Sequence, residues 1–220
     1  MAKYLIHAGP KRMLYVRDHL IPSMLKQGIA KEDIRVYCDE AHEGNLRACM
    51  NAFKSCEGEG GTWHLQDDVC ISKDFKARTE WYDQGLVCGF SSLFYDGNIE
   101  EKKGAVSRKN MWFSFPCIRI PNEWARECGD WVLNYIIGNP VYKKYWEKGV
   151  NDDWAFRTYL QTFHQDCVAL NIMPCLVDHV DYLLGGGTGA IARERPVRAQ
   201  YWDSDELVEA LEVAINGRTR

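Results

Sequence analysis

The sequence lacks several features that mark whole classes of protein. None of its nine cysteines forms a Cys-x-x-Cys pair, so we expect no structural zinc site. Most of the cysteines lie within apolar patterns, which indicates reduced thiols buried in a core. No apolar run approaches the roughly 20 residues that span a bilayer, and the first residues lack the long apolar segment of a signal peptide. The sequence therefore predicts a cytoplasmic protein with no membrane span.

An excess of positive charge is also absent. The 220 residues carry a formal net charge of −4, which argues against a general polyanion-binding protein. Hydrophobic residues make up 46% of the chain, enough for a substantial core, so disorder over most of the length is excluded. There is no internal repeat. The length fits one domain, residues 1–190, with a C-terminal loop and amphipathic helix, residues 191–220, that pack on it.

The first half alternates between two kinds of hydrophobic pattern. Short β-rich runs alternate with apolar residues at helical spacing, and short polar links separate them. We expect strands at 3–8, 34–38 and 63–65 and helices at 13–28 and 46–53, the first helix being kinked or restarted at Pro22. This alternation predicts an α/β fold, a single Rossmann-like domain with a mostly parallel sheet flanked by helices.

The second half has a less regular pattern. We expect helices at 75–82, from Pro121 onward, from Asn151 onward and at 204–215, and strands at 86–90, 112–120 and 174–177. Residues 95–110 are polar and glycine-bearing, which predicts a mobile loop. In the helix after Asn151, the spacing places Phe156 and Phe163 toward the core.

The chain is organised around Gln66-Asp67-Asp68, which lies between the apolar runs 63–65 and 69–71. This pattern predicts a buried strand that ends in two adjacent acids. Two crowded carboxylates repel each other, so they need a cation or a hydrogen-bond network. Mg²⁺ and Mn²⁺ take oxygen ligands and bridge to phosphate oxygens, which makes such a pair suited to nucleotide chemistry. A solvated turn is the alternative interpretation.

Further polar residues follow the first two predicted strands. Ligands gather at the carboxyl ends of parallel strands, so these loops are candidates for nucleotide binding. The segment Ala8-Gly9-Pro10 lets the backbone approach a base or ribose, and Arg12 can reach a phosphate. Asp39 can accept hydrogen bonds from a base or ribose, and Asn45, at the start of the next helix, belongs to the same set. A tight turn and a surface aspartate are the alternatives.

Three more candidates lie in the second half. Asp152 and Asp153 open a predicted helix, and a carboxylate placed there can take a proton from a hydroxyl group. Capping of that helix is the alternative. His179 follows the last predicted strand, and its alternative is a hydrogen-bonded core histidine. The functional interpretation depends on the order and joint presence of these groups.

In order and spacing, residues 3–190 resemble the GT-A class of nucleotide-sugar glycosyltransferases. The resemblance rests on Trp-His-Leu-Gln-Asp-Asp-Val at 63–69, on the acids at 152–153 and on Leu-Val-Asp-His-Val-Asp at 176–181. The amino-acid sequences of these segments look like those of a small bacterial or phage branch of the class. The resemblance implies a GT-A domain, in the cytoplasm of a bacterium or of a phage-infected host.

The resemblance also implies roles for the candidate residues. Asp68 and His179 would hold Mn²⁺ or Mg²⁺ against the donor diphosphate, and Gln66 and Asp67 would contact the nucleotide sugar. Asp153, or its neighbour Asp152, would be the catalytic base of an inverting transfer. The implied donor is a UDP-sugar. The implied acceptor is a glycan or another hydroxyl group, with a hydroxylated base in DNA as an alternative.

Gln66 departs from the family pattern, because an acid usually stands at this place. A neutral glutamine gives a metal ion less charge, so the resemblance implies a weaker dependence on metal. Two other functions remain open: a non-catalytic nucleotide- or glycan-binding module of the same fold, and a sugar nucleotidyltransferase. Against the second, only one glycine, Gly9, stands in the loop after the first strand, where nucleotidyltransferases carry several. The sequence leaves the oligomeric state open.

Overall fold

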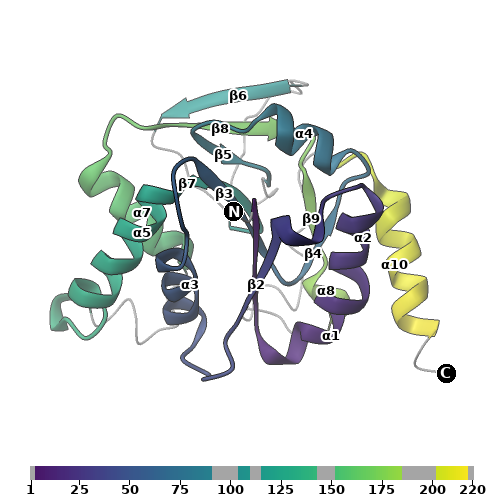
Figure 1. Ribbon diagram of the computed structural model, residues 1–220, viewed down its shortest axis with the longest axis horizontal. Coiled ribbons are helices and arrows are strands. Elements are labelled where there is room, and N and C mark those ends of the chain that lie inside the picture. Colours follow the sequence, from purple (N-terminus) through teal and green to yellow (C-terminus); the bar gives the residue numbers. More distant parts are fainter. Residues whose placement is uncertain (1–2, 91–103, 110–114, 143–151, 185–201, 218–220) are drawn as a thin grey trace.

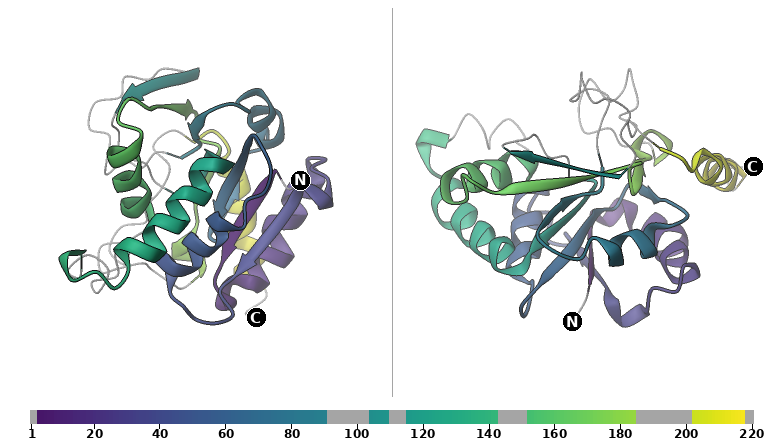
Figure 2. Two further views of the ribbon diagram at one scale, coloured as in Figure 1. Left: turned by 60° about the vertical axis from the view of Figure 1, so that its left-hand side comes forward. Right: turned by 90° about the horizontal axis from the view of Figure 1, so that it is seen from above.

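A computed structural model describes residues 3–90, 104–109, 115–142, 152–184 and 202–217. A seven-stranded sheet runs through the middle, and helices cover both of its faces (Figures 1 and 2). The strands of this sheet are β1 (Tyr4–Ala8), β2 (Ile34–Cys38), β3 (Gly61–Gln66), β5 (Leu86–Cys88), β6 (Gly104–Lys109), β7 (Cys117–Pro121) and β8 (Val168–Met173).

The strand order in the sheet is β2-β1-β3-β7-β5-β8-β6. β1 pairs in parallel with β2 and β3, and β5 pairs in parallel with β8, whereas β7 and β6 are antiparallel to their neighbours. Five strands therefore point one way, and β6 and β7 point the other. The predicted α/β fold with a mostly parallel sheet is confirmed.

The helices form a layer on each face of the sheet. The first layer contains α3 (Asn45–Lys54), α5 (Asn122–Trp131) and α7 (Asp152–Phe163). The second contains α1 (Met13–Tyr15), the π-helical segment η2 (Val16–Leu20), α2 (Ile21–Lys26), α4 (Phe75–Trp81), α8 (Asp181–Leu184) and the C-terminal helix α10 (Asp205–Gly217). None of the helices in the described ranges is long and apolar enough to cross a membrane.

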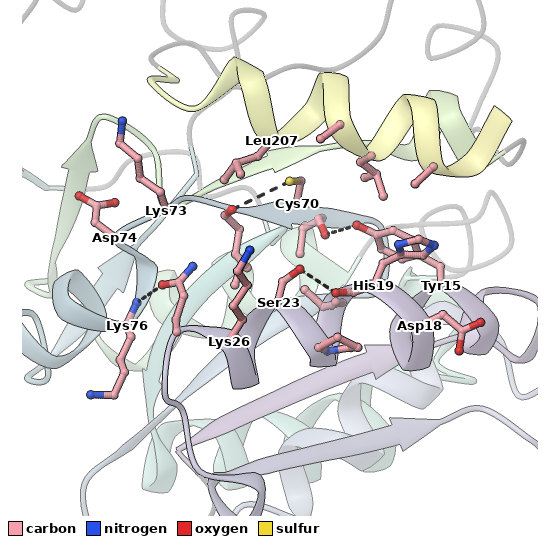
Figure 3. A pocket seen from close by; sticks show the side chains of 18 of the residues that line it. Tyr15, Asp18, His19, Ser23, Lys26, Cys70, Lys73, Asp74, Lys76 and Leu207 are labelled. Carbon is pink, nitrogen blue, oxygen red and sulfur yellow. Dashed lines mark hydrogen bonds between the residues drawn. The ribbon is translucent and has the colours of Figure 1, made fainter. Parts of the chain in front are cut away.

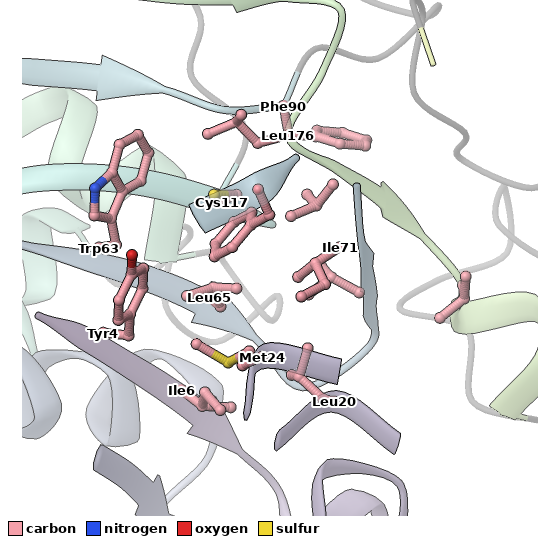
Figure 4. Close-up of a cluster of buried hydrophobic side chains, with 14 of the residues drawn as sticks. Tyr4, Ile6, Leu20, Met24, Trp63, Leu65, Ile71, Phe90, Cys117 and Leu176 are labelled. Atoms are coloured by element: carbon pink, nitrogen blue, oxygen red, sulfur yellow. The ribbon is translucent and has the colours of Figure 1, made fainter. Parts of the chain in front are cut away.

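Strand periodicity explains why the core has two halves. Leu5 and Ile6 are both fully buried, but they belong to different clusters because successive side chains of a strand point to opposite faces. Ile6 packs with Leu20, Met24 and Leu65 in the cluster of Figure 4. Burial of each such side chain stabilises the fold by roughly 1.5–3 kcal/mol.

The first helical region changes type before Pro22, as the sequence predicts. The segment η2 (Val16–Leu20) is π-helical, and α2 begins at Ile21 with Pro22 in its first turn. A proline lacks the N–H that would bond to the preceding turn, so it is tolerated at a helix start and not in a helix interior. The chain nevertheless stays helical from Met13 to Lys26, so the structure shows a change of helix type ahead of Pro22 and no break in the helix.

A second, two-stranded sheet lies beside the main one. β4 (Val69–Ile71) pairs antiparallel with β9 (Val177–His179), and Val69 stands opposite His179. The Val180 N–H also donates to the Asp68 carbonyl oxygen at 2.8 Å. This short ladder brings together two site residues that are far apart in the sequence.

Four predictions about local structure were wrong in detail. Within the segment 95–110, which the sequence predicts to be a loop, residues 104–109 form β6 on β8. The last strand begins at Val177 and not at residue 174, and β8 precedes it. Pro121 ends β7 and caps α5 instead of starting that helix. Phe163, at the end of α7, is 54% exposed instead of buried.

Candidate functional site

The carboxyl ends of β1, β2 and β3 meet at one edge of the sheet. Ala8 pairs with Cys38 and His7 pairs with Gln66, so the loops that follow these strands are neighbours. The Asp39 N–H donates to the Ala8 carbonyl oxygen at 3.0 Å, which ties the first two loops together. The predicted convergence of strand-end residues is present in the structure.

Asp67 is held by the loop that follows β1. Its carboxylate accepts a hydrogen bond from the Gly9 N–H at 2.7 Å and one from Arg12 Nη1 at 3.0 Å. Burial and the charge of Asp68 nevertheless raise the pKa of Asp67 to about 6. Asp67 thus fixes the glycine loop against the end of β3.

Asp68 is almost fully buried and forms an ion pair with His179. His179 Nε2 lies 3.0 Å from Asp68 Oδ2, and Arg12 contacts the same oxygen. Burial alone would raise the pKa of Asp68, but the positive charges of His179 and Arg12 hold it below its ordinary value. The pKa of His179 is raised, since the charge of Asp68 outweighs the effect of burial.

Arg12 is the centre of this acidic cluster. Its guanidinium group contacts Asp67, Asp68 and also Asp181, the first residue of α8. The carboxylates raise the pKa of Arg12 although burial opposes this. The sequence interpretation missed Asp181. Its position two residues after the candidate ligand His179 could have indicated it.

Gln66 contacts Asp152, the first acid of α7. Its side-chain amide hydrogen-bonds to Asp152, and so does the thiol of Cys49 on α3. Asp152 is buried, and burial raises its pKa in spite of these donors. The glutamine at the end of β3 therefore connects the two pairs of acids in space.

Asp153 is less buried than its neighbour. Burial and the charge of Asp152 raise the pKa of Asp153 to about 7, although the Trp154 N–H and the charge of Arg157 oppose this shift. The Trp154 N–H donates to Asp153 Oδ1 at 2.7 Å. A carboxylate with a pKa near 7 is half ionised at neutral pH, as a general base requires.

Three predicted residues at this edge are more exposed. Asp39 accepts hydrogen bonds from the Glu43 N–H at 2.8 Å and the Gly44 N–H at 3.1 Å, so its carboxylate organises its own loop. Pro10 begins the 3-10 turn η1 (Pro10–Arg12), and Asn45 begins α3; both are exposed. Their roles in nucleotide binding stay predictions.

Asp68 and His179 are the candidate ligands of a divalent cation. The described residues contain no group of three or more His, Cys, Asp or Glu side chains arranged to hold a metal ion. The 3.0 Å between Asp68 Oδ2 and His179 Nε2 equals the separation of two neighbouring ligands of an octahedral Mg²⁺, which is about 3 Å. Among the described residues, Asp68 Oδ1 is buried without a hydrogen-bond partner. A cation with two protein ligands, completed by phosphate oxygens and water, fits these residues.

One cavity lies away from this cluster. It has a volume of about 790 Å³ and lies between α2, η2, β4, α4 and α10 (Figure 3). Lysines and acids both line it, among them Lys26, Lys73, Asp18 and Asp74. None of the predicted site residues lines it. The cavity is therefore distinct from the candidate site.

Comparisons with known proteins assign no family to this chain. No protein-family model matches it, and no curated protein sequence matches it. Among solved structures, A197 from STIV is similar at 12% identity with a TM-score of 0.45, over 81% of this chain and 85% of that one. HddC from Yersinia pseudotuberculosis is similar at 16% identity with a TM-score of 0.33, over 58% of this chain and 80% of that one. The structure of HddC complexed with GMP-PN matches over the same shares, at 14% identity with a TM-score of 0.34. At these identities and TM-scores the likenesses carry no argument about function.

Proposed function

We propose that the protein is a metal-dependent glycosyltransferase that moves a sugar from a nucleotide-sugar donor to an acceptor hydroxyl group. One observation carries the proposal. The strand-end acid Asp68 forms an ion pair with His179, and Gln66, the last residue of β3, hydrogen-bonds to Asp152 at the start of α7. The pair that we propose as metal ligands and the acids at the start of α7 thus belong to one edge of a mostly parallel sheet, the carboxyl edge, where α/β proteins bind ligands.

The residues of the acidic cluster would serve the donor. Asp68 and His179 would hold Mn²⁺ or Mg²⁺, which when bound would supply positive charge to the departing nucleoside diphosphate. The backbone of the Gly9 loop, held by Asp67, allows close approach of a nucleotide. A UDP-sugar is the donor that we propose.

The start of α7 would serve the acceptor. Asp153 is the candidate base because it is less buried than Asp152 and its pKa, raised to about 7, allows it to take up a proton near neutral pH. Asp152 is enclosed by Gln66 and Cys49, which suits a positioning role. A carboxylate on the acceptor side, opposite the leaving diphosphate, is what an inverting transfer requires. We propose a glycan acceptor.

Calorimetry with UDP and GDP, with and without Mn²⁺, tests the donor site. Binding should depend on Mn²⁺ and weaken sharply in Asp68→Ala, whereas Asp130→Ala, on the exposed end of α5, should bind as the wild type does. Release of sugar from a UDP-sugar panel then tests catalysis. Equal binding with and without chelator would remove the metal ion from the proposal. Binding without any sugar release would favour the non-catalytic module.

A further inference from the structure

The cluster already contains a cation that belongs to the chain. Arg12 reaches three carboxylates from separate segments: Asp67 and Asp68 after β3, and Asp181 at the start of α8. Its side chain is only 19% exposed. A buried carboxylate is costly without a partner, so Arg12 stabilises these acids when nothing else neutralises them.

The contacts of Arg12 use the oxygen atoms that a metal ion would need. Arg12 shares Asp68 Oδ2 with His179, so one of the two ligand atoms of the candidate metal pair already has two partners. Asp68 Oδ1, on the same carboxylate, is buried without a hydrogen-bond partner among the described residues. An arginine can satisfy several carboxylates with its planar fork of donors, but it leaves fewer oxygen lone pairs for an octahedral ion.

We propose that Arg12 is the resident cation of this site and that it excludes a divalent ion until it leaves the acids. Asp68 and His179 then have two states. In one they pair with each other while Arg12 contacts Asp68, and in the other they are ligands of the divalent ion. The inference rests on the proposed function for the identity of the ion and deepens it by naming the side chain that regulates access. The released guanidinium group is free to bind phosphate oxygens of the donor, since bidentate binding of phosphate suits arginine.

Titration of Mn²⁺ against chelator-treated protein, followed by the electron paramagnetic resonance signal of free Mn²⁺, tests this inference without nucleotide or turnover. Arg12→Gln should bind Mn²⁺ at least about tenfold more tightly than the wild type, because the competing cation is gone. Arg12→Lys should also bind more tightly, since one ammonium group cannot span three carboxylates. Arg17→Gln is the matched control, because among the described residues Arg17 forms its ion pair with the neighbouring Asp18 on the surface, and its side chain is 70% exposed.

If Arg12→Gln folds poorly, its melting temperature with and without Mn²⁺ tests the same inference. Mn²⁺ should raise its melting temperature more than that of the wild type, because at equal concentration a ligand that binds the folded state more tightly stabilises it more. If Arg12→Gln stays unfolded even with Mn²⁺, the affinity of Arg12→Lys decides. Equal or weaker Mn²⁺ binding in the Arg12 variants, or no binding in any protein, overturns the inference. Failure of the proposed function would be seen separately, as absence of UDP binding and sugar release.

Discussion

The replacement Asp153→Asn tests the assignment of the catalytic base and has opposite effects on stability and activity. In the folded protein the pKa of Asp153 is raised from 3.8 to about 7. The unfolded chain therefore loses this proton at lower pH, and the contribution of Asp153 to stability falls as the pH rises from 3.8 to about 7. Above that range the protein carries the full cost of an ionised, partly buried carboxylate.

The size of this cost follows from the pKa shift. One pKa unit corresponds to about 1.4 kcal/mol, so the upper limit is about 4 kcal/mol. Asp153 is partly exposed, and solvent screening reduces the expected value to roughly 1–2 kcal/mol. Asp153→Asn should therefore unfold at a higher temperature than the wild type at pH 8, by about 2–4 °C for each kcal/mol, and at the same temperature at pH 3.

The same variant should lose catalysis. Asparagine keeps the shape of the side chain but cannot take up the acceptor proton, which costs about 10²–10⁴ in rate with nearly unchanged donor affinity. Wild-type activity should rise with pH through about 7, the pKa of Asp153, and the residual activity of the variant should not. Sugar release at a series of pH values, with calorimetry of UDP binding, measures both effects.

Asp152→Asn is the matched control. It removes the charge that helps to raise the pKa of Asp153, so the pH profile should shift to lower pH while activity at pH 8 stays within about tenfold of the wild type. The assignment of roles is wrong if Asp152→Asn loses as much activity as Asp153→Asn. If neither variant loses activity, the proposed glycosyltransferase function has no base at α7 and fails.

Three further predictions concern the structure around the site. Gln66→Glu places a carboxylate against buried Asp152, so urea unfolding at pH 8 should show a loss of roughly 1–3 kcal/mol that disappears at pH 3. His7 is partly buried and hydrogen-bonded to His64 at 2.8 Å, and loss of hydration lowers its pKa to about 3. Stability should therefore fall as the pH decreases from 6.5 toward 3, with a shallower slope in His7→Gln, which cannot titrate. In Gly129→Ala the new Cβ would lie 2.6 Å from a backbone carbonyl oxygen of α3, which forces α3 and α5 apart. Urea unfolding should show a loss of roughly 1–3 kcal/mol in the free energy of unfolding. No loss would mean that the two helices can move apart freely.

The parts of the fold that the sequence predicts best are those whose pattern is local. β1, β2 and β3 are short apolar runs, and α3 has apolar residues at helical spacing, so each element is visible within its own few residues. The sequence does not predict β6, because the apolar residues of Gly104–Lys109, Ala105 and Val106, are adjacent and do not alternate with polar ones. β6 lies at the edge of the sheet, where a strand does not need that alternation. β6 pairs with β8, whose residues lie 59 to 69 positions further along the chain, so no local pattern indicates the pairing.

The same distinction applies to the candidate site. Asp67, Asp68 and His179 could be proposed from the sequence because they directly follow or end strands, and strand ends gather at one edge. The contact of Arg12 with Asp181 joins residues 169 positions apart, and spacing alone cannot predict it. A motif therefore located the acids, but only the fold reveals which cation neutralises them.

The structure also gives a physical reason for the glutamine at position 66. A carboxylate at this place would face buried Asp152, whose pKa is already raised, and would remove the amide that hydrogen-bonds to it. The negative charge that position 66 lacks is present instead at Asp181, which reaches Arg12 from the start of α8. A neutral residue at position 66 therefore leaves the acidic cluster around Arg12 with three carboxylates, because Asp181, which follows β9 and Val180, joins Asp67 and Asp68 there.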